Sequence, residues 1–315
     1  MKKQLWPPIG KWIILLLSIA AYGFISYKLF NFQYWDQLFI HVIPFKQLSL
    51  IAGVLLLLWF LNILCEAKKW QSLIKPFISI TIRAAFQQVF AGTTTGVGSP
   101  GRIAEMGGRM ALLPKMYRTD AAIMTTIGGF IQSSIIFGVG LLALFLMPIA
   151  NVFYFNTELY VGVLAGLILI ILLALAAVWR YSAKARYYLR RAISVGTTAI
   201  GKAYFWTLLR YLIYNMQLLT WMHLMGVEID NSLWLGLSCL YFFFVSIVPS
   251  HIIIDMGIRG SVALFLFLMI TDNTIAVLSA IFAMWMTNVI IPTLIGSVVL
   301  IKQKPIKEAL TQKET

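Results

Sequence analysis

The residues of this chain that could do chemistry begin in a glycine-rich stretch, residues 91–113, within an otherwise apolar sequence. Its several glycines and Pro100 predict a break in any helix that enters it. Past the break, Arg102 begins a second helical run in which Glu105 and Arg109 follow at spacings of three and four. Residues at these spacings share one helix face, so we expect a stripe of alternating charge there.

The loop at residues 93–101, which includes Ser99 and Gly101, is the first candidate binding segment. Non-helical backbone at membrane depth is tolerated only where it is buried in protein or lines water, so we expect this loop to face a cavity. Its exposed N–H groups and the start of the helix near Arg102 are suited to an anion. The Arg102 guanidinium adds a bidentate donor for phosphate or carboxylate.

A similar pattern recurs late in the chain, where an apolar run breaks at Pro249 and resumes past Gly257. Asp255 and Arg259 lie four residues apart beside this second break. We predict that the two broken helices face each other inside a membrane protein. Arg102 and Arg259 would then meet in one wet pocket.

Charges within apolar segments cost about 2.5–3.5 kcal/mol each, so these side chains must be paired, hydrated or both. The five charged candidates sum to +1, which suits an anionic or zwitterionic headgroup; they are Arg102, Glu105, Arg109, Asp255 and Arg259. The alternative is that they form purely structural ion pairs, with Arg109 as an interfacial anchor. Arg210, one or two turns into its helix, is interpreted as snorkelling to the cytoplasmic surface.

Composition places the chain among all-α polytopic membrane proteins. It has 315 residues, 60% hydrophobic and 11% charged, whereas soluble domains are nearer a quarter charged. The net charge of +14 resides in short loops, which is the positive-inside signature and not that of a nucleic-acid-binding protein. Cys65 and Cys239 lie in apolar runs, and no catalytic or metal-ligand pattern is present. We therefore expect no enzyme activity, cofactor or metal.

Hydropathy and charge predict six transmembrane helices plus two re-entrant helical hairpins. Glu66, Lys68, Lys69 and Lys75 are interpreted as a cytoplasmic loop after the second span. The predicted spans are 12–30, 48–65, 121–152, 159–179, 204–225 and 274–301, and the hairpins lie at about 76–113 and 232–270.

The order of two spans, a hairpin and a span occurs twice, starting from opposite sides of the membrane. We therefore predict one domain over 1–315 built as an inverted repeat, with halves at about 10–157 and 158–302 and a polar tail at 303–315. Both termini would be cytoplasmic. Repeats of this kind place the substrate near the midplane, at the broken helices.

Three segments resemble the lysylphosphatidylglycerol synthase transmembrane-region family, which comprises flippase-like domains and stand-alone membrane relatives. They are Ser99-Pro100-Gly101-Arg102-Ile103-Ala104-Glu105 followed by Arg109, then Pro249 through Asp255-Met256-Gly257-Ile258-Arg259, and the Glu66…Lys69-Trp70 corner. The likeness covers roughly residues 10–302. Ala104 stands where the family usually has glycine, and Gly260 where a glutamate is common.

The resemblance implies a flippase-like protein of the bacterial inner membrane that translocates or accommodates a lipid headgroup. The substrate would be a phospholipid or a polyprenyl-linked lipid. An alternative is a membrane scaffold that docks a glycosyltransferase or lipid-modifying enzyme through the basic loop at 180–202. A third is an intramembrane transferase in which Glu105 and Asp255 would be the acid and base.

Overall fold

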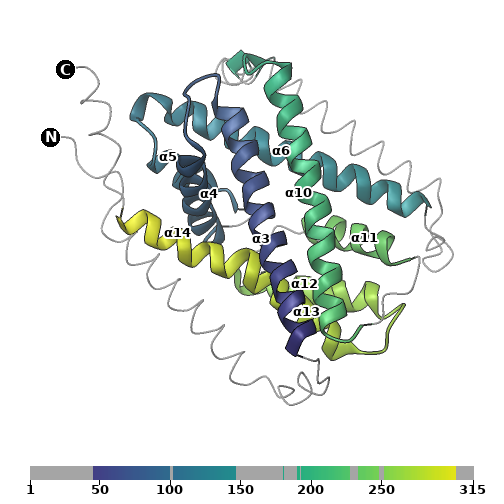
Figure 1. Ribbon diagram of the computed structural model, residues 1–315. Coiled ribbons are helices and arrows are strands. Elements are labelled where there is room, and N and C mark those ends of the chain that lie inside the picture. The colour runs from purple at the N-terminus through teal and green to yellow at the C-terminus, as the bar shows by residue number, and fades with distance from the viewer. Residues whose placement is uncertain are drawn as a thin grey trace.

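The computed structural model describes residues 45–99, 102–146, 180, 190–191, 193–227, 233–247 and 252–302. These residues are mostly helical and contain no strand (Figure 1), which confirms the all-α class. The predicted first and fourth spans, the tail 303–315, and Pro100, Gly101 and Pro249 lie outside the described residues.

The helices follow one another with short connections between them. They are α3 (Phe45–Ile74), α4 (Ile82–Val97), α5 (Glu105–Ala111), the 3-10 turn η2 (Lys115–Tyr117), α6 (Arg118–Leu146), α10 (Thr197–Leu224), α11 (Trp234–Ile247), α12 (Ile252–Phe267), α13 (Thr274–Trp285), the π-helical segment η3 (Met286–Ile290) and α14 (Ile291–Lys302).

Three helical segments are long and apolar enough to cross a membrane: Gln47–Ile74, Lys115–Leu146 and Thr274–Lys302. They agree with the predicted second, third and sixth spans, and they make this a membrane protein. The predicted fifth span is the 28-residue helix α10, which is not among the three. Its apolar run is interrupted by the polar residues Thr207, Arg210, Asn215 and Gln217.

The helices pack across the two halves of the chain. α3 and α10 run side by side through the centre, α4 packs against α14, and α11 packs against α6 (Figure 1). Two apolar clusters flank this centre. One joins α3, α4 and the start of α6 around Trp70, and the other joins α10 to α13 around Tyr241 and Phe267.

Gly92 and Gly96 do not break α4, which continues through both to Val97. The predicted break at these glycines was wrong because they serve close packing against α5. A Cβ on Gly92 would lie 3.0 Å from Cγ of Glu105, and one on Gly96 would lie 3.2 Å from its Cβ. Small residues four apart allow two helix backbones to approach in this way. The exposed loop N–H groups predicted from residue 93 are therefore largely helical ones.

The turn between α4 and α5 is closed by side-chain hydrogen bonds. The Ser99 hydroxyl accepts from the Ala104 N–H at 2.8 Å and donates to the Gly96 carbonyl at 3.0 Å. Arg102 lies in this turn with φ of 59°, so it does not begin the second helix as predicted. That helix begins at Glu105 and has only seven residues, because a left-handed residue cannot continue a right-handed helix.

The second helix pair, α11 and α12, occupies the predicted second hairpin, but α12 begins at Ile252. Gly257 is therefore an interior helical residue and does not mark the restart of the helix. No heavy atom lies within 4 Å of a Cβ built on Gly257, so no close packing depends on it. A single glycine costs a helix only about 1 kcal/mol, which the surrounding apolar residues can offset.

The last span is interrupted at η3, a feature absent from the sequence-based prediction. The Ile291 N–H bonds to the Met286 carbonyl in the π register. The next residue in that register, Pro292, has no N–H to offer the Thr287 carbonyl. The Trp59 indole of α3 donates to that carbonyl instead, at 2.8 Å. This bond ties α3 to the irregular segment.

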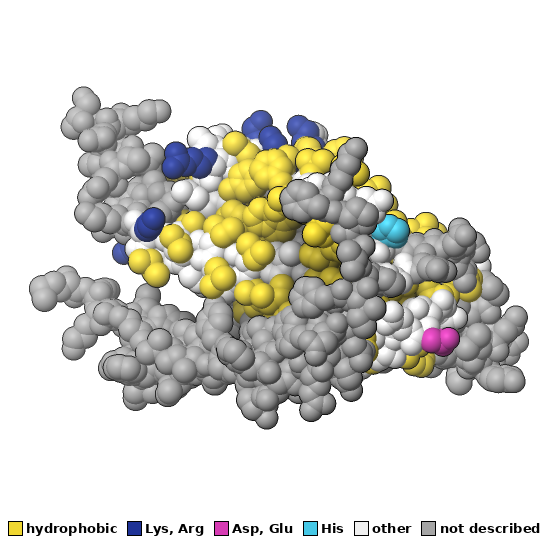
Figure 2. Space-filling view, turned by 60° about the horizontal axis from the view of Figure 1, so that its bottom comes forward, with side chains coloured by type: hydrophobic (Ala, Val, Ile, Leu, Met, Phe, Trp, Pro, Cys, Tyr) yellow, Lys and Arg dark blue, Asp and Glu magenta, His cyan; other side chains and the backbone are white. Residues whose placement is uncertain are grey.

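Hydrophobic side chains cover much of the described surface, and Lys and Arg gather along one rim of it (Figure 2). The exposed basic residues lie at the end of α3, at the starts of α6 and α10, and at the end of α14: Lys75, Lys115, Lys202 and Lys302. Asp272, which is exposed, precedes the start of α13, at the other end of the 29-residue span. This charge asymmetry is typical of membrane proteins.

Candidate functional site

Glu66 is the centre of a buried polar network between α3, α5 and α10. Its carboxylate contacts Lys69 Nζ at 2.7 Å, Arg109 Nη2 at 2.7 Å and Arg210 Nη1 at 2.6 Å. The predicted cytoplasmic loop at Glu66 and Lys69 was wrong, because α3 continues to Ile74 and buries both side chains. A buried carboxylate that faces three cations is held by its partners, and each partner depends on it.

Arg210 lies within the membrane protein's interior and does not snorkel to the surface. Besides Glu66, its guanidinium donates to Asn62 Oδ1 at 3.1 Å and Gln132 Oε1 at 3.0 Å. It also stacks over the Tyr214 ring, 5.2 Å from the ring centroid. Its side chain is 14% exposed. The snorkelling interpretation failed because α10 packs along α3, where Glu66 supplies a counter-charge that the local sequence does not reveal.

The predicted stripe of alternating charge is present, although only part of it is helical. Arg109 Nη2 contacts Glu105 as well as Glu66, and its guanidinium stacks over Trp70 at 4.9 Å from the ring centroid. With its side chain 3% exposed, Arg109 is not an interfacial anchor. Arg102 Nε lies 3.7 Å from Glu105 Oε2, and its side chain is 43% exposed.

The Glu105 carboxyl is kept ionised by its neighbours. Burial by itself would raise its pKa, but the nearby charges of Arg109 and Arg102 outweigh burial and lower the pKa below its usual value. Glu105 therefore counts as a full negative charge near neutral pH.

On the second helix pair, Asp255 and Arg259 form an ion pair along α12. Arg259 Nε lies 2.8 Å from Asp255 Oδ2, and the Trp285 indole of α13 donates to the same oxygen at 3.1 Å. This pairing is one that the structural alternative also predicted. It fixes the carboxylate and aligns the guanidinium.

Two cavities lie beside these groups. The first, of about 360 Å³, is called the Glu66 cavity; its charged lining residues are Glu66, Lys69, Arg102, Glu105, Arg109 and Arg210. The second, of about 320 Å³, is called the Arg259 cavity; it is lined by Ser99, Arg102, Arg210, Ser246, Asp255 and Arg259 among others.

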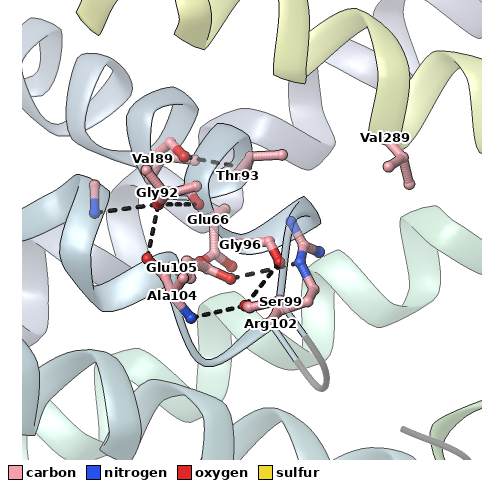
Figure 3. A network of polar contacts seen from close by, with 12 residues as sticks. Glu66, Val89, Gly92, Thr93, Gly96, Ser99, Arg102, Ala104, Glu105 and Val289 are labelled. Carbon is pink, nitrogen blue, oxygen red and sulfur yellow. Dashed lines mark hydrogen bonds and ion pairs between the residues drawn. The ribbon is translucent and has the colours of Figure 1, made fainter. Parts of the chain in front are cut away.

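Arg102 and Arg259 line the same cavity, as the sequence predicted. Figure 3 shows the Arg102 side chain between the α4–α5 turn and Val289 of η3, which also lines the Arg259 cavity. The two cavities share four lining residues: Arg102, Gln132, Arg210 and Tyr214. Gly257 is not among the lining residues of either cavity.

The formal charge of both cavities is positive. Four cations face two carboxylates in the Glu66 cavity, and three cations face one carboxylate in the Arg259 cavity, so each has an excess of two positive charges. The sequence-based sum of +1 was too low because it omitted Lys69 and Arg210 and also Glu66. Such an excess favours an anionic ligand over a cationic one.

Several residues of this network escaped the sequence analysis, namely Asn62, Glu66, Lys69, Gln132, Arg210 and Tyr214. A signal existed for Glu66 and Arg210, because an ionisable residue in a span is a functional candidate in its own right. Asn62, Glu66 and Lys69 also recur at spacings of four and three, on one helix face. Reading them as the end of a span hid that face.

No protein-family model matches the chain, and neither the curated proteins nor the solved structures include a match. Among the described residues, no group of three His, Cys, Asp or Glu side chains is placed to hold a metal ion. The arrangement consists of guanidinium, ammonium and amide donors around a cavity. Its chemistry is suited to anion binding.

Proposed function

We propose that this chain is a flippase-like integral membrane protein that translocates or accommodates an anionic lipid or lipid-linked headgroup across a bacterial inner membrane. The observation that carries the proposal is a pair of cavities that share Arg102 and Arg210 inside an apolar, membrane-spanning body. A headgroup that crosses the hydrocarbon layer needs polar groups to replace its water.

The outer surface supports a lipid substrate. The described spans expose large hydrophobic side chains along their length, such as Leu56, Phe130 and Leu294, which suit contact with acyl chains. The polar groups instead line the cavities. This separation would let a headgroup occupy a cavity while its tails remain in the bilayer.

The packing supports an inverted repeat as the frame for this activity. In the first half, a long helix (α3), a short pair (α4 and α5) and a long helix (α6) follow one another; α10, α11 and α12, and the α13–α14 span repeat that order. Each short pair packs against the last long helix of the other half. We propose that the two pairs are re-entrant and rock against each other around the shared arginines.

The test is lipid scrambling by the purified chain in liposomes that contain a fluorescent phosphatidylglycerol. If the chain translocates the lipid, dithionite will bleach inner-leaflet dye as well as outer-leaflet dye. Arg102→Gln should slow this bleaching by about tenfold or more, the loss expected for one charge-assisted contact.

Arg83→Gln is the matched control, because Arg83 is an exposed arginine of α4 that lines neither cavity. Equal bleaching by wild type, Arg102→Gln and protein-free liposomes would refute the proposal. Scrambling by the purified chain alone would also show that docking a glycosyltransferase or lipid-modifying enzyme is not its whole role.

A further inference from the structure

Arg109 has an unused hydrogen-bond donor in the wall of the Glu66 cavity. Its Nη2 contacts both Glu66 and Glu105, whereas its Nε is buried and has no partner among the described residues. Buried polar groups in proteins are almost always paired, and a guanidinium left partly unpaired is costly. An acceptor oxygen supplied by a ligand would satisfy this donor set.

Arg102 is a second cation whose donors remain available to a ligand. Its Nε is 3.7 Å from the Glu105 carboxylate, beyond hydrogen-bond distance, and its guanidinium makes no hydrogen bond within the described part of the chain. The backbone holds Arg102 at φ 59°, a conformation that is costly for a non-glycine residue. Costs of this kind persist where the surroundings fix a residue in place, and they cluster at ligand sites.

Lys69 completes a set of three cationic side chains around the same space. Its Nζ contacts Glu66 Oε2, and its side chain is only 4% exposed. A cavity of about 360 Å³ lies within the size range of small-molecule sites. The two carboxylates of the cavity offset two of its four cations, so a ligand with two negative charges would balance the remainder.

We propose that the Glu66 cavity binds the terminal phosphate of a lipid phosphomonoester, with Lys69, Arg102 and Arg109 as donors. This inference rests on the proposed function and narrows its substrate class. A terminal phosphate carries up to two negative charges and three non-bridging oxygens near neutral pH. A phosphodiester headgroup offers one charge and two such oxygens, and an amine-bearing headgroup would add a positive charge to a cavity already in excess.

Competition in native mass spectrometry tests the proposal. The purified chain is mixed with equal amounts of phosphatidic acid and phosphatidylglycerol that have the same acyl chains. We expect phosphatidic acid adducts to exceed phosphatidylglycerol adducts by about tenfold, the effect of one additional charge-assisted hydrogen bond. Arg102→Gln should abolish this preference, Arg102→Lys should keep part of it, and Arg83→Gln should leave it unchanged.

Equal adducts of the two lipids would overturn the phosphomonoester while leaving the proposed function standing, provided that Arg102-dependent scrambling is observed. If inorganic phosphate alone forms the Arg102-dependent adduct and phosphatidic acid does not, the cavity binds phosphate and the lipid source is wrong. Absence of both lipid adducts and of scrambling would overturn this inference together with the proposed function.

Discussion

Removing the negative charge of Glu66 would leave Lys69 and Arg210 without their shared carboxylate, while Arg109 would retain Glu105. Breaking a buried ion pair on one side costs about 3–5 kcal/mol, because the remaining charges stay desolvated. We therefore expect Glu66→Gln to lower the free energy of unfolding by about that amount. The measurement is thermal unfolding in detergent, followed by tryptophan fluorescence.

Asp272→Asn is the control for Glu66→Gln, since Asp272 is an exposed acid on the same chain. Surface substitutions of this kind change stability by no more than about 0.5 kcal/mol. If Glu66→Gln unfolds at the temperature of the wild type, the carboxylate does not organise the network, and the account of the site given above is wrong.

At the residue scale, the sequence revealed local pairs and concealed distant ones. Arg102, Glu105 and Arg109 lie within eight residues, so helical spacing alone predicted their contact. The bond between Glu66 and Arg210 joins residues 144 positions apart, and no spacing rule links them. An unpaired reading of Arg210 left snorkelling as the only way to hydrate its charge.

At the element scale, the glycines on the α4–α5 interface control how closely the two helices approach. A Cβ on Gly108 would overlap the carbonyl oxygen of Ala91 in α4, whereas one on the adjacent Gly107 would meet no atom within 4 Å. We expect Gly108→Ala to destabilise the chain by about 1–3 kcal/mol, because overpacking forces the backbones apart.

Gly107→Ala is a matched control in the same short helix. An alanine there removes freedom from the unfolded chain and should leave stability unchanged or raise it by about 0.4–1 kcal/mol. Unfolding temperatures of the two variants in detergent, with scrambling rates measured in parallel, make the comparison. Equal effects of the two substitutions would show that close packing at Gly108 is not what holds α5 on α4.

The same glycines show why element boundaries were hard to predict. Within a sequence, Gly92 and Gly96 indicate a helix break, whereas against a partner helix they indicate close approach. Only the position of α5 decides between these meanings, and that position is a tertiary fact. The irregular segment η3 was missed for a related reason, because Pro292 signals a kink but not the indole of Trp59 that accommodates it.

At the scale of the whole molecule, hydropathy and charge predicted the class of protein and the second, third and sixth spans. They succeed because a bilayer requires long apolar helices whatever the tertiary packing. The pairing of α4 with α14 and of α11 with α6 joins opposite ends of the chain and follows from no local pattern. The re-entrant character of the short helix pairs remains a prediction, and it concerns sidedness.

Sidedness can be measured by cysteine labelling, in a variant whose buried Cys65 and Cys239 are replaced by alanine. A membrane-impermeant maleimide should label Asp272→Cys in intact cells, and should label Lys75→Cys and Lys115→Cys only after permeabilisation. These lysines flank α4 and α5, so equal sidedness means that the pair enters and leaves on one face. Labelling of Lys75→Cys and Lys115→Cys from opposite sides would make the pair a crossing and remove the inverted repeat.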